Sequence, residues 1–141
     1  MSTLFELKFD KKQRTTISCK TILSIGKFVS IFKLAIDTGS YYTFIDKEAL
    51  EKMFGVNIER DKEKKKFTSA TGKEFANSII SDYIEIGKIK NVLYPVYLKK
   101  FPPGLSVEGI LGWSFFDNLG VSFDFKNGIF SVEELLEAYN G

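Results

Sequence analysis

The most informative segment of the chain is Leu34-Ala35-Ile36-Asp37-Thr38-Gly39-Ser40. Its apolar beginning is typical of a buried strand. The strand ends at Asp37, and Thr38-Gly39 then predicts a sharp turn, because glycine has no side chain to restrict the backbone. We therefore predict a strand that presents one carboxylate on a tight turn.

The composition excludes several kinds of chemistry. The chain has 141 residues and no histidine, so Ser-His, Cys-His and histidine-ligated metal chemistry are excluded within one chain. The single cysteine, Cys19, cannot form an intrachain disulfide or a cysteine-rich zinc site. We interpret it as a small apolar strand residue, with a redox or intermolecular disulfide role as the alternative. Any catalysis must therefore use carboxylates, hydroxyls, lysines or tyrosines.

Charge and hydropathy limit the compartment and the partners. The net charge of +2 is too small to indicate nucleic acid or an anionic membrane. The sequence shows no secretory signal and no apolar run of the roughly 18 to 20 residues that a membrane span needs. With no disulfide framework, we expect a cytoplasmic protein that binds neither nucleic acid nor membrane.

Strand patterns dominate the chain, which contains 14 Phe and 6 Tyr. The expected strands are Leu4–Phe9, Thr15–Ile25 and Phe28–Ile36 as a hairpin, Tyr42–Ile45, two strands within Phe67–Ile80, Tyr83–Ile86 and Val92–Leu98 as a hairpin, Val107–Leu111, and Val121–Phe125 with Ile129–Val132 as a hairpin. The charged segment Glu59–Lys66 is interpreted as a solvated loop or strand edge, with a recognition patch as the alternative.

Three short helices are expected between and after these strands. They are Lys47–Phe54, capped by Asp46 and closed by Gly55, then Trp113–Leu119, stopped by Gly120, and finally Val132–Tyr139, which begins at a capping box of Ser131 and Glu134. Many short strands with two or three helices predict a mainly β domain, a small closed barrel that spans residues 1–141.

A second motif downstream supports a functional interpretation of the Asp-Thr-Gly triplet. A bare Asp-Thr-Gly triplet occurs by chance in about 2% of chains of this length. Here an apolar strand precedes the triplet, and Gly109-Ile110-Leu111-Gly112 lies downstream in an apolar-apolar-Gly pattern. The two motifs in this order are a strong signal.

Over Phe5–Val132 the chain resembles the retropepsin-like aspartic peptidases, the single-domain relatives of pepsin. The order of elements carries the resemblance, together with the segments 109–116 and 121–128. The resemblance implies the closed barrel of that family, with a core of about 5–132 and a helix of about 132–139. It also implies endopeptidase activity on extended peptides without a cofactor or metal.

The resemblance assigns a role to each residue of the first motif. Asp37 is the expected catalytic carboxylate, and Thr38 is expected to hydrogen-bond across a dimer axis. Gly39 lets the backbone turn and brings its N–H near the carboxylate. Ser40 is expected to donate its hydroxyl to the outer oxygen of Asp37, which favours the charged form.

This chemistry needs two carboxylates, and the chain has one Asp-Thr-Gly. Asp124-Phe125-Lys126 lacks the glycine, whereas Asp46 and Asp117 lie where helix caps or turns are expected. A symmetric homodimer is the simplest way to complete the site, with the two Asp37 side chains sharing one proton. Its substrate would be a peptide or protein.

The turn at Ala70-Thr71-Gly72-Lys73 occupies the place of the family's flap, which closes over bound peptide. An ordinary surface hairpin is the alternative for this turn. Two alternatives stay open for the whole chain. The first is a module that kept the fold for peptide binding or dimerisation without efficient catalysis, and the second is an unrelated β-barrel with a chance triplet.

Overall fold

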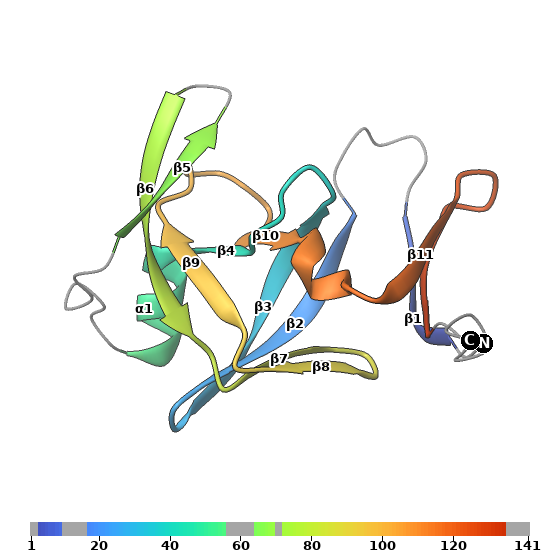
Figure 1. Ribbon diagram of the computed structural model, residues 1–141, viewed down its shortest axis with the longest axis horizontal. Helices are drawn as coiled ribbons and strands as arrows, with labels where there is room; N and C mark the ends of the chain where they lie inside the picture. Colours follow the sequence, from blue (N-terminus) through green and yellow to red (C-terminus); the bar gives the residue numbers. More distant parts are fainter. Residues whose placement is uncertain (1–2, 10–16, 56–63, 70–71, 135–141) are drawn as a thin grey trace.

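A computed structural model describes residues 3–9, 17–55, 64–69 and 72–134 of the chain (Figure 1). For residues 64–69 and 72–75 the backbone is described. More than half of the described residues lie in strands, which confirms the prediction of a mainly β protein.

The described elements are short and follow one another closely. In chain order they are β1 (Thr3–Lys8), β2 (Ser18–Ile25), β3 (Phe28–Asp37), β4 (Phe44–Asp46), α1 (Lys47–Phe54), β5 (Lys64–Ser69), β6 (Gly72–Ile80), β7 (Tyr83–Ile86), β8 (Ile89–Val92), β9 (Pro95–Lys99), β10 (Gly109–Gly112), the 3-10 turn η1 (Trp113–Phe116), β11 (Leu119–Asp124) and β12 (Ile129–Glu134).

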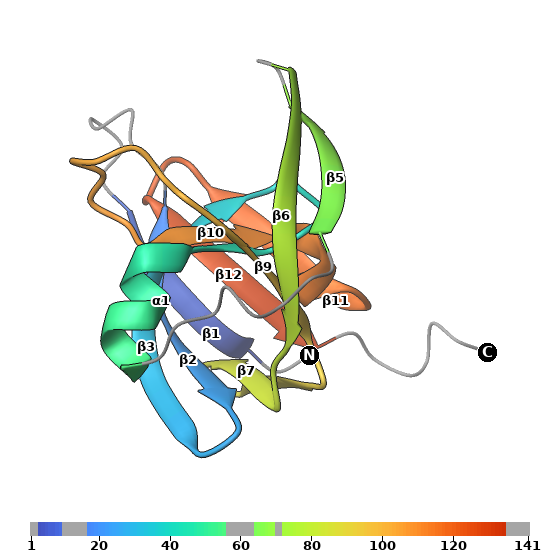
Figure 2. The ribbon, with the colours of Figure 1, turned by 90° about the vertical axis from the view of Figure 1, so that its left-hand side faces the viewer.

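The strands form two sheets. A three-stranded sheet has the order β1-β12-β11, and a nine-stranded sheet has the order β5-β6-β9-β4-β10-β3-β2-β7-β8. In both ribbon views the β5–β6 hairpin projects from the body of the molecule, and Figure 1 shows the smaller sheet at the opposite end (Figures 1 and 2). The described ladders give a curled, half-barrel sheet that runs from β5 to β8, which agrees with the small barrel that the sequence predicts.

The middle of the large sheet brings together segments that are far apart in the sequence. Strand β10 pairs in parallel with β3 on one side and antiparallel with β4 on the other. Strand β4 in turn pairs in parallel with β9. The carboxyl end of β3, where Asp37 lies, therefore meets the carboxyl end of β10.

Side chains alternate between the two faces of this sheet. Ile36, Leu111 and Ile45 point into the main core, where Phe32, Phe115 and Phe130 are fully buried. A second, smaller cluster lies on the opposite face. It contains Phe44, Ala76 and Tyr97, with Tyr42, Phe101 and Ile110 packed against it. The sheet thus has an apolar cluster on each side.

The prediction of helix α1 is confirmed in its bounds, but its cap is different. Gly55 ends the helix with a φ of 67°, as expected for a left-handed C-terminal glycine. Asp46 makes no side-chain capping bond. Its Oδ1 instead accepts the backbone N–H of Phe101 at 3.1 Å, so the carboxylate ties the start of the helix to the loop after β9.

The other two predicted helices are wrong where the structure describes them. Trp113–Leu119 forms only the 3-10 turn η1, because Asn118 takes a φ of 68° and Leu119 already begins β11. The predicted terminal helix cannot begin at Val132, since β12 continues to Glu134. Burial of Val132 within the β1-β12-β11 ladder outweighs the local capping signal. Residues 135–139 lie outside the described residues.

One hairpin pairs differently from the prediction. Tyr83–Ile86 pairs with Ile89–Val92 through a turn at Gly87, whose φ is 56°. The remainder of the predicted partner, Pro95–Lys99, is β9 and pairs with β6 and β4. The two-residue turn at Gly87-Lys88 lets β8 pair directly with β7 at one edge of the large sheet. Strand β9 then lies between β6 and β4, in another part of the same sheet.

Two further sequence interpretations have a structural outcome. Lys64–Lys66 lies in β5 at the edge of the large sheet, which agrees with a strand edge, and 59–63 lies outside the described residues. Cys19 is a buried residue of β2, and burial raises the pKa of its thiol. No helix within the described ranges is long and apolar enough to cross a membrane.

Gly109 provides a test of the packing between β10 and β4. A Cβ at this position would overlap the carbonyl oxygen of Phe44 and lie 2.9 Å from the Cα of Ile45. Because both atoms belong to the backbone, we expect Gly109→Ala to lower the free energy of unfolding by at least about 3 kcal/mol. Urea unfolding measures the loss.

Gly26→Ala is the matched control for this substitution. A Cβ at Gly26 meets nothing within 4 Å, so only its positive φ of 59° opposes alanine. The expected cost is about 1 kcal/mol. An equal loss in the two variants would contradict the proposed steric role of Gly109.

Candidate active site

Asp37 is the last residue of β3 and begins the turn that the sequence predicted. The backbone N–H of Gly39 donates to Asp37 Oδ1 at 2.9 Å, and the N–H of Ser40 donates to the Asp37 carbonyl at 3.2 Å. A Cβ at Gly39 would lie 3.2 Å from Asp37 Oδ1, so glycine keeps the approach to the carboxylate open. Asp37 is half-buried, while Thr38 and Gly39 are exposed.

Ser40 has a different partner from the one predicted. Its hydroxyl donates to the carbonyl of Tyr42 at 2.8 Å rather than to Asp37. A hydroxyl has a single proton to donate, so this bond excludes the predicted donation to the Asp37 carboxylate in this structure. Ser40 therefore holds the loop that follows the turn, while the Gly39 N–H contacts the carboxylate.

The Gly-Ile-Leu-Gly motif lies directly beside Asp37. Gly112 pairs with Asp37 in the parallel ladder, one step beyond the pair of Leu111 and Ile36. A Cβ at Gly112 would collide with the backbone of Tyr41 and Tyr42, so only glycine lets the Asp37 loop lie against β10. The two sequence motifs are therefore brought together as neighbours.

Two backbone hydrogen bonds extend this contact beyond Gly112. Trp113 N–H donates to the Ser40 carbonyl at 2.8 Å, and Ser114 N–H donates to the Tyr41 carbonyl at 3.1 Å. The start of η1 is thus tied to the loop that follows Asp37. Because both bonds come from η1, they hold the loop against the end of β10 and restrict the position of the Asp37 turn.

A buried polar network that sequence reasoning missed supports the loop. The Gly112 N–H donates to Thr43 Oγ1 at 2.9 Å. The Tyr94 hydroxyl lies 2.8 Å from Thr43 Oγ1 and 2.7 Å from Ser114 Oγ. Thr43 is fully buried, so the network supplies the polar partners that a buried hydroxyl and amide require. The three side chains come from separate segments, and no local pattern could have indicated their contact.

Tyr94 stays a neutral phenol within this network. Burial raises the pKa of its hydroxyl, and the hydrogen bonds to Ser114 and Thr43 oppose this shift. The side chain therefore acts as a bridge between Thr43 and Ser114.

The predicted flap is described only in part. Gly72 and Lys73 begin β6 and pair with Ser69 and Thr68 of β5, whereas Ala70 and Thr71 lie outside the described residues. In both ribbon views the hairpin rises on the same side of the molecule as the connection from β3 to β4 (Figures 1 and 2). The arrangement of the hairpin is compatible with the predicted flap, and its role stays a prediction.

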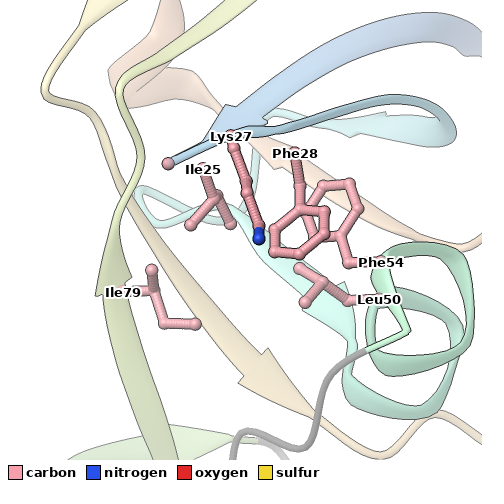
Figure 3. A pocket seen from close by; sticks show the side chains of 7 residues that line it. Ile25, Lys27, Phe28, Leu50, Phe54 and Ile79 are labelled. Atoms are coloured by element: carbon pink, nitrogen blue, oxygen red, sulfur yellow. The ribbon is translucent and has the colours of Figure 1, made fainter.

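An apolar hollow lies at the other end of β3. It has a volume of about 400 Å³ and lies between the β2–β3 turn, α1 and β6 (Figure 3). Its lining residues are Ile25, Gly26, Lys27, Phe28, Leu50, Phe54 and Ile79. Phe28 begins β3 and Asp37 ends it, so this hollow is separate from the carboxylate.

Comparison with known proteins identifies the family and the fold of the chain. Residues 25–115 match the sequence model of the family described as aspartyl protease, so the chain belongs to this family. A retropepsin-like aspartic protease from Rickettsia conorii is similar in structure, with a TM-score of 0.67, 20% sequence identity and coverage of 94% of each chain. This likeness confirms the predicted retropepsin-type fold. No curated protein matches the chain in sequence.

Thr43 offers a test of the buried network. Thr43→Val keeps the shape of the side chain but leaves the buried Gly112 N–H without its acceptor. We expect the free energy of unfolding to fall by about 2 kcal/mol. Thr43→Ser keeps the hydroxyl and should cost about 1 kcal/mol for the lost methyl group. Equal losses in chemical denaturation would contradict the role of the hydroxyl.

Tyr94 should make stability depend on pH in the alkaline range. Its pKa is raised in the folded state, so the unfolded chain loses this proton first as pH increases. The resulting stabilisation is present below the unfolded pKa and is lost as pH rises through the folded pKa. We therefore expect the fall in stability between about pH 9 and 11 to be smaller in Tyr94→Phe than in the wild type. Parallel pH curves for the two proteins would contradict this expectation.

Proposed function

We propose that the chain is an aspartic endopeptidase that acts on extended peptides as a symmetric homodimer. The observation that carries the proposal is the placement of Asp37. Its carboxylate accepts a hydrogen bond from the Gly39 N–H at 2.9 Å. Its backbone pairs with Gly112, and its side chain lies on the face of the sheet opposite the main core. The turn therefore presents a fixed carboxylate to the outside of the domain.

Peptide hydrolysis by carboxylates requires two of them in different protonation states. The ionised Asp37 accepts a proton from a water molecule, whose oxygen bonds to the carbon of the peptide carbonyl. The protonated Asp37 of the second copy donates its proton to the carbonyl oxygen. The diol then collapses: one of its hydroxyls returns a proton to the second Asp37 carboxylate as the C=O bond reforms, the C–N bond breaks, and the leaving nitrogen takes a proton from the first carboxyl group.

Two of the other aspartates in the described part of the chain have side-chain partners of their own. Asp46 Oδ1 accepts the Phe101 N–H, and the carboxylate of Asp124 bonds to the backbone and side chain of Asn127. A second copy of the chain is therefore the simplest source of the second carboxylate. The exposed side chain of Thr38 supports this proposal, since the turn is accessible to a partner.

In this proposal the β5–β6 hairpin is the flap. Residues 70–73 would close over the peptide, exclude water and offer backbone hydrogen bonds to an extended substrate. The antiparallel ladder between β5 and β6 continues to the pair of Ser69 and Gly72, which gives the hairpin a regular backbone up to its turn.

The Asp37→Asn variant tests the proposal. The amide cannot accept or donate the catalytic proton, so we expect cleavage of a mixed peptide library to fall about a thousandfold or more. Thermal unfolding and sedimentation should show an unchanged fold and dimer. Asp82→Asn, which makes the same chemical change at an exposed position before β7, is the control and should cleave like the wild type.

Two results would overturn the proposal. Undiminished cleavage by Asp37→Asn would remove Asp37 from the chemistry. Wild-type protein that stays monomeric at high micromolar concentration and cleaves no peptide would favour the module that binds peptides or dimerises without catalysis.

A further inference from the structure

The sheet face that carries Asp37 also carries the second apolar cluster. Residues that pair directly across a ladder point to the same face. Ile110 pairs with Phe44, and Phe44 pairs with Tyr97. Gly112, two residues after Ile110 on the same strand, pairs with Asp37. The rings of Phe44 and Tyr97 therefore lie on the side of the sheet from which the carboxylate emerges.

Aromatic rings continue from this cluster to the Asp37 loop. We call the chain of rings the aromatic rim, and it consists of Phe44, Tyr97, Tyr42, Tyr41 and Trp113. Successive ring centroids are 5.9, 5.1, 5.1 and 4.5 Å apart. These spacings lie within the range in which aromatic rings attract one another.

The rim is buried at one end and exposed at the other. Phe44 and Tyr97 are each only 7% exposed, whereas Tyr41 is 43% exposed and Trp113 is 45% exposed. The exposed pair meets edge to face, with an angle of 78° between the rings. Large aromatic side chains that stay accessible beside a catalytic residue are typical of recognition sites.

The backbone holds the exposed pair rigidly. The Trp113 N–H bonds to the carbonyl of Ser40, and the Ser114 N–H bonds to the carbonyl of Tyr41. The two rings therefore belong to segments that are hydrogen-bonded to each other and to the Asp37 turn. A site that is already ordered loses little conformational entropy when a ligand binds.

We infer that Tyr41 and Trp113 form a substrate subsite that selects an aromatic side chain of the peptide, close to the bond that is cleaved. The inference rests on the proposed function, because it assigns a substrate preference to the Asp37 site. A third ring can add to the edge-to-face pair with the geometry that aromatic rings favour. An aliphatic side chain of equal size gains a similar free energy from the burial of its apolar surface, but it cannot make the edge-to-face contact between rings.

Binding can be measured without catalysis. Trp113 is the only tryptophan of the chain, so its fluorescence reports on the subsite alone. The full-length Asp37→Asn protein is titrated with octapeptides of alanine and serine that carry one phenylalanine, moved through the eight positions. A matched series carries cyclohexylalanine, which has similar size but no aromatic ring, and calorimetry measures the affinity of each peptide independently.

We expect phenylalanine at one position to change Trp113 emission and to bind about three- to tenfold tighter than cyclohexylalanine at that position. Tyr41→Leu in the same protein should remove the preference, and Tyr41→Phe should keep it. Equal affinities for the two series, or saturation without a change in Trp113 emission, would overturn the inference. So would the failure of every peptide to bind.

Cleavage by the protein with intact Asp37 separates this inference from the proposed function. If peptides are cleaved without any preference for an aromatic ring, the inference fails and the peptidase assignment stands. If nothing is cleaved but the aromatic preference in binding is present, the peptidase assignment fails and the subsite stands. The selectivity of each variant is its kcat/KM for the phenylalanine peptide divided by its kcat/KM for the cyclohexylalanine peptide.

Sedimentation distinguishes the subsite from a contact between two copies. Phe125→Leu, at an exposed ring that follows β11, is the control and should change neither the dimer nor the selectivity. We expect Tyr41→Leu to dimerise like the wild type. A weaker dimer, with an equal loss of kcat/KM for both peptide series, would make the pair part of the interface between copies and overturn the inference.

Discussion

The parallel contact between β3 and β10 is the constraint on which the rest of the site depends. It places Gly112 opposite Asp37 and lets the loop after Asp37 lie directly on the end of β10. A side chain at Gly112 would occupy the space of the Tyr41 and Tyr42 backbone. The hydrogen bonds from Trp113 and Ser114 to that loop exist only because the two backbones come this close. The position of the carboxylate therefore follows from a missing Cβ on a neighbouring strand.

The alternation of side chains along these strands explains how one sheet serves both stability and chemistry. Ile36 and Leu111 enter the main core, while their neighbours Asp37 and Ile110 face the other way. A shift of one residue in the register of β10 would turn Leu111 out of the main core and would move Gly112 away from its position opposite Asp37. The apolar residues on the core face thus fix the register, and the register determines where Asp37 emerges. Core packing and site geometry are in this sense the same property of the sheet.

Local signals in the sequence predicted what depends on neighbouring residues, and they failed where distant segments decide. The strand before Asp37, helix α1 and its terminal Gly55 could be predicted from residues within a few positions. Asp46 was expected to cap α1, but the N–H of Phe101 competes for its carboxylate. Ser40 was expected to bond to Asp37, but the Tyr42 carbonyl is the acceptor. Thr43, Tyr94 and Ser114 meet only in the folded chain, so no local spacing could reveal their network.

A site that needs two copies of Asp37 imposes a symmetry on everything near it. In the proposed homodimer each copy contributes one turn, one β5–β6 hairpin and one aromatic rim, related by a two-fold axis. A peptide has a direction and no such symmetry, so its two halves would meet equivalent surfaces in opposite orientations. The aromatic rim would then be offered on both sides of the cleaved bond. Each copy would place its own Tyr41 and Trp113 beside the pair of carboxylates. An aromatic side chain on either side of the cleaved bond would therefore satisfy the preference that these residues set.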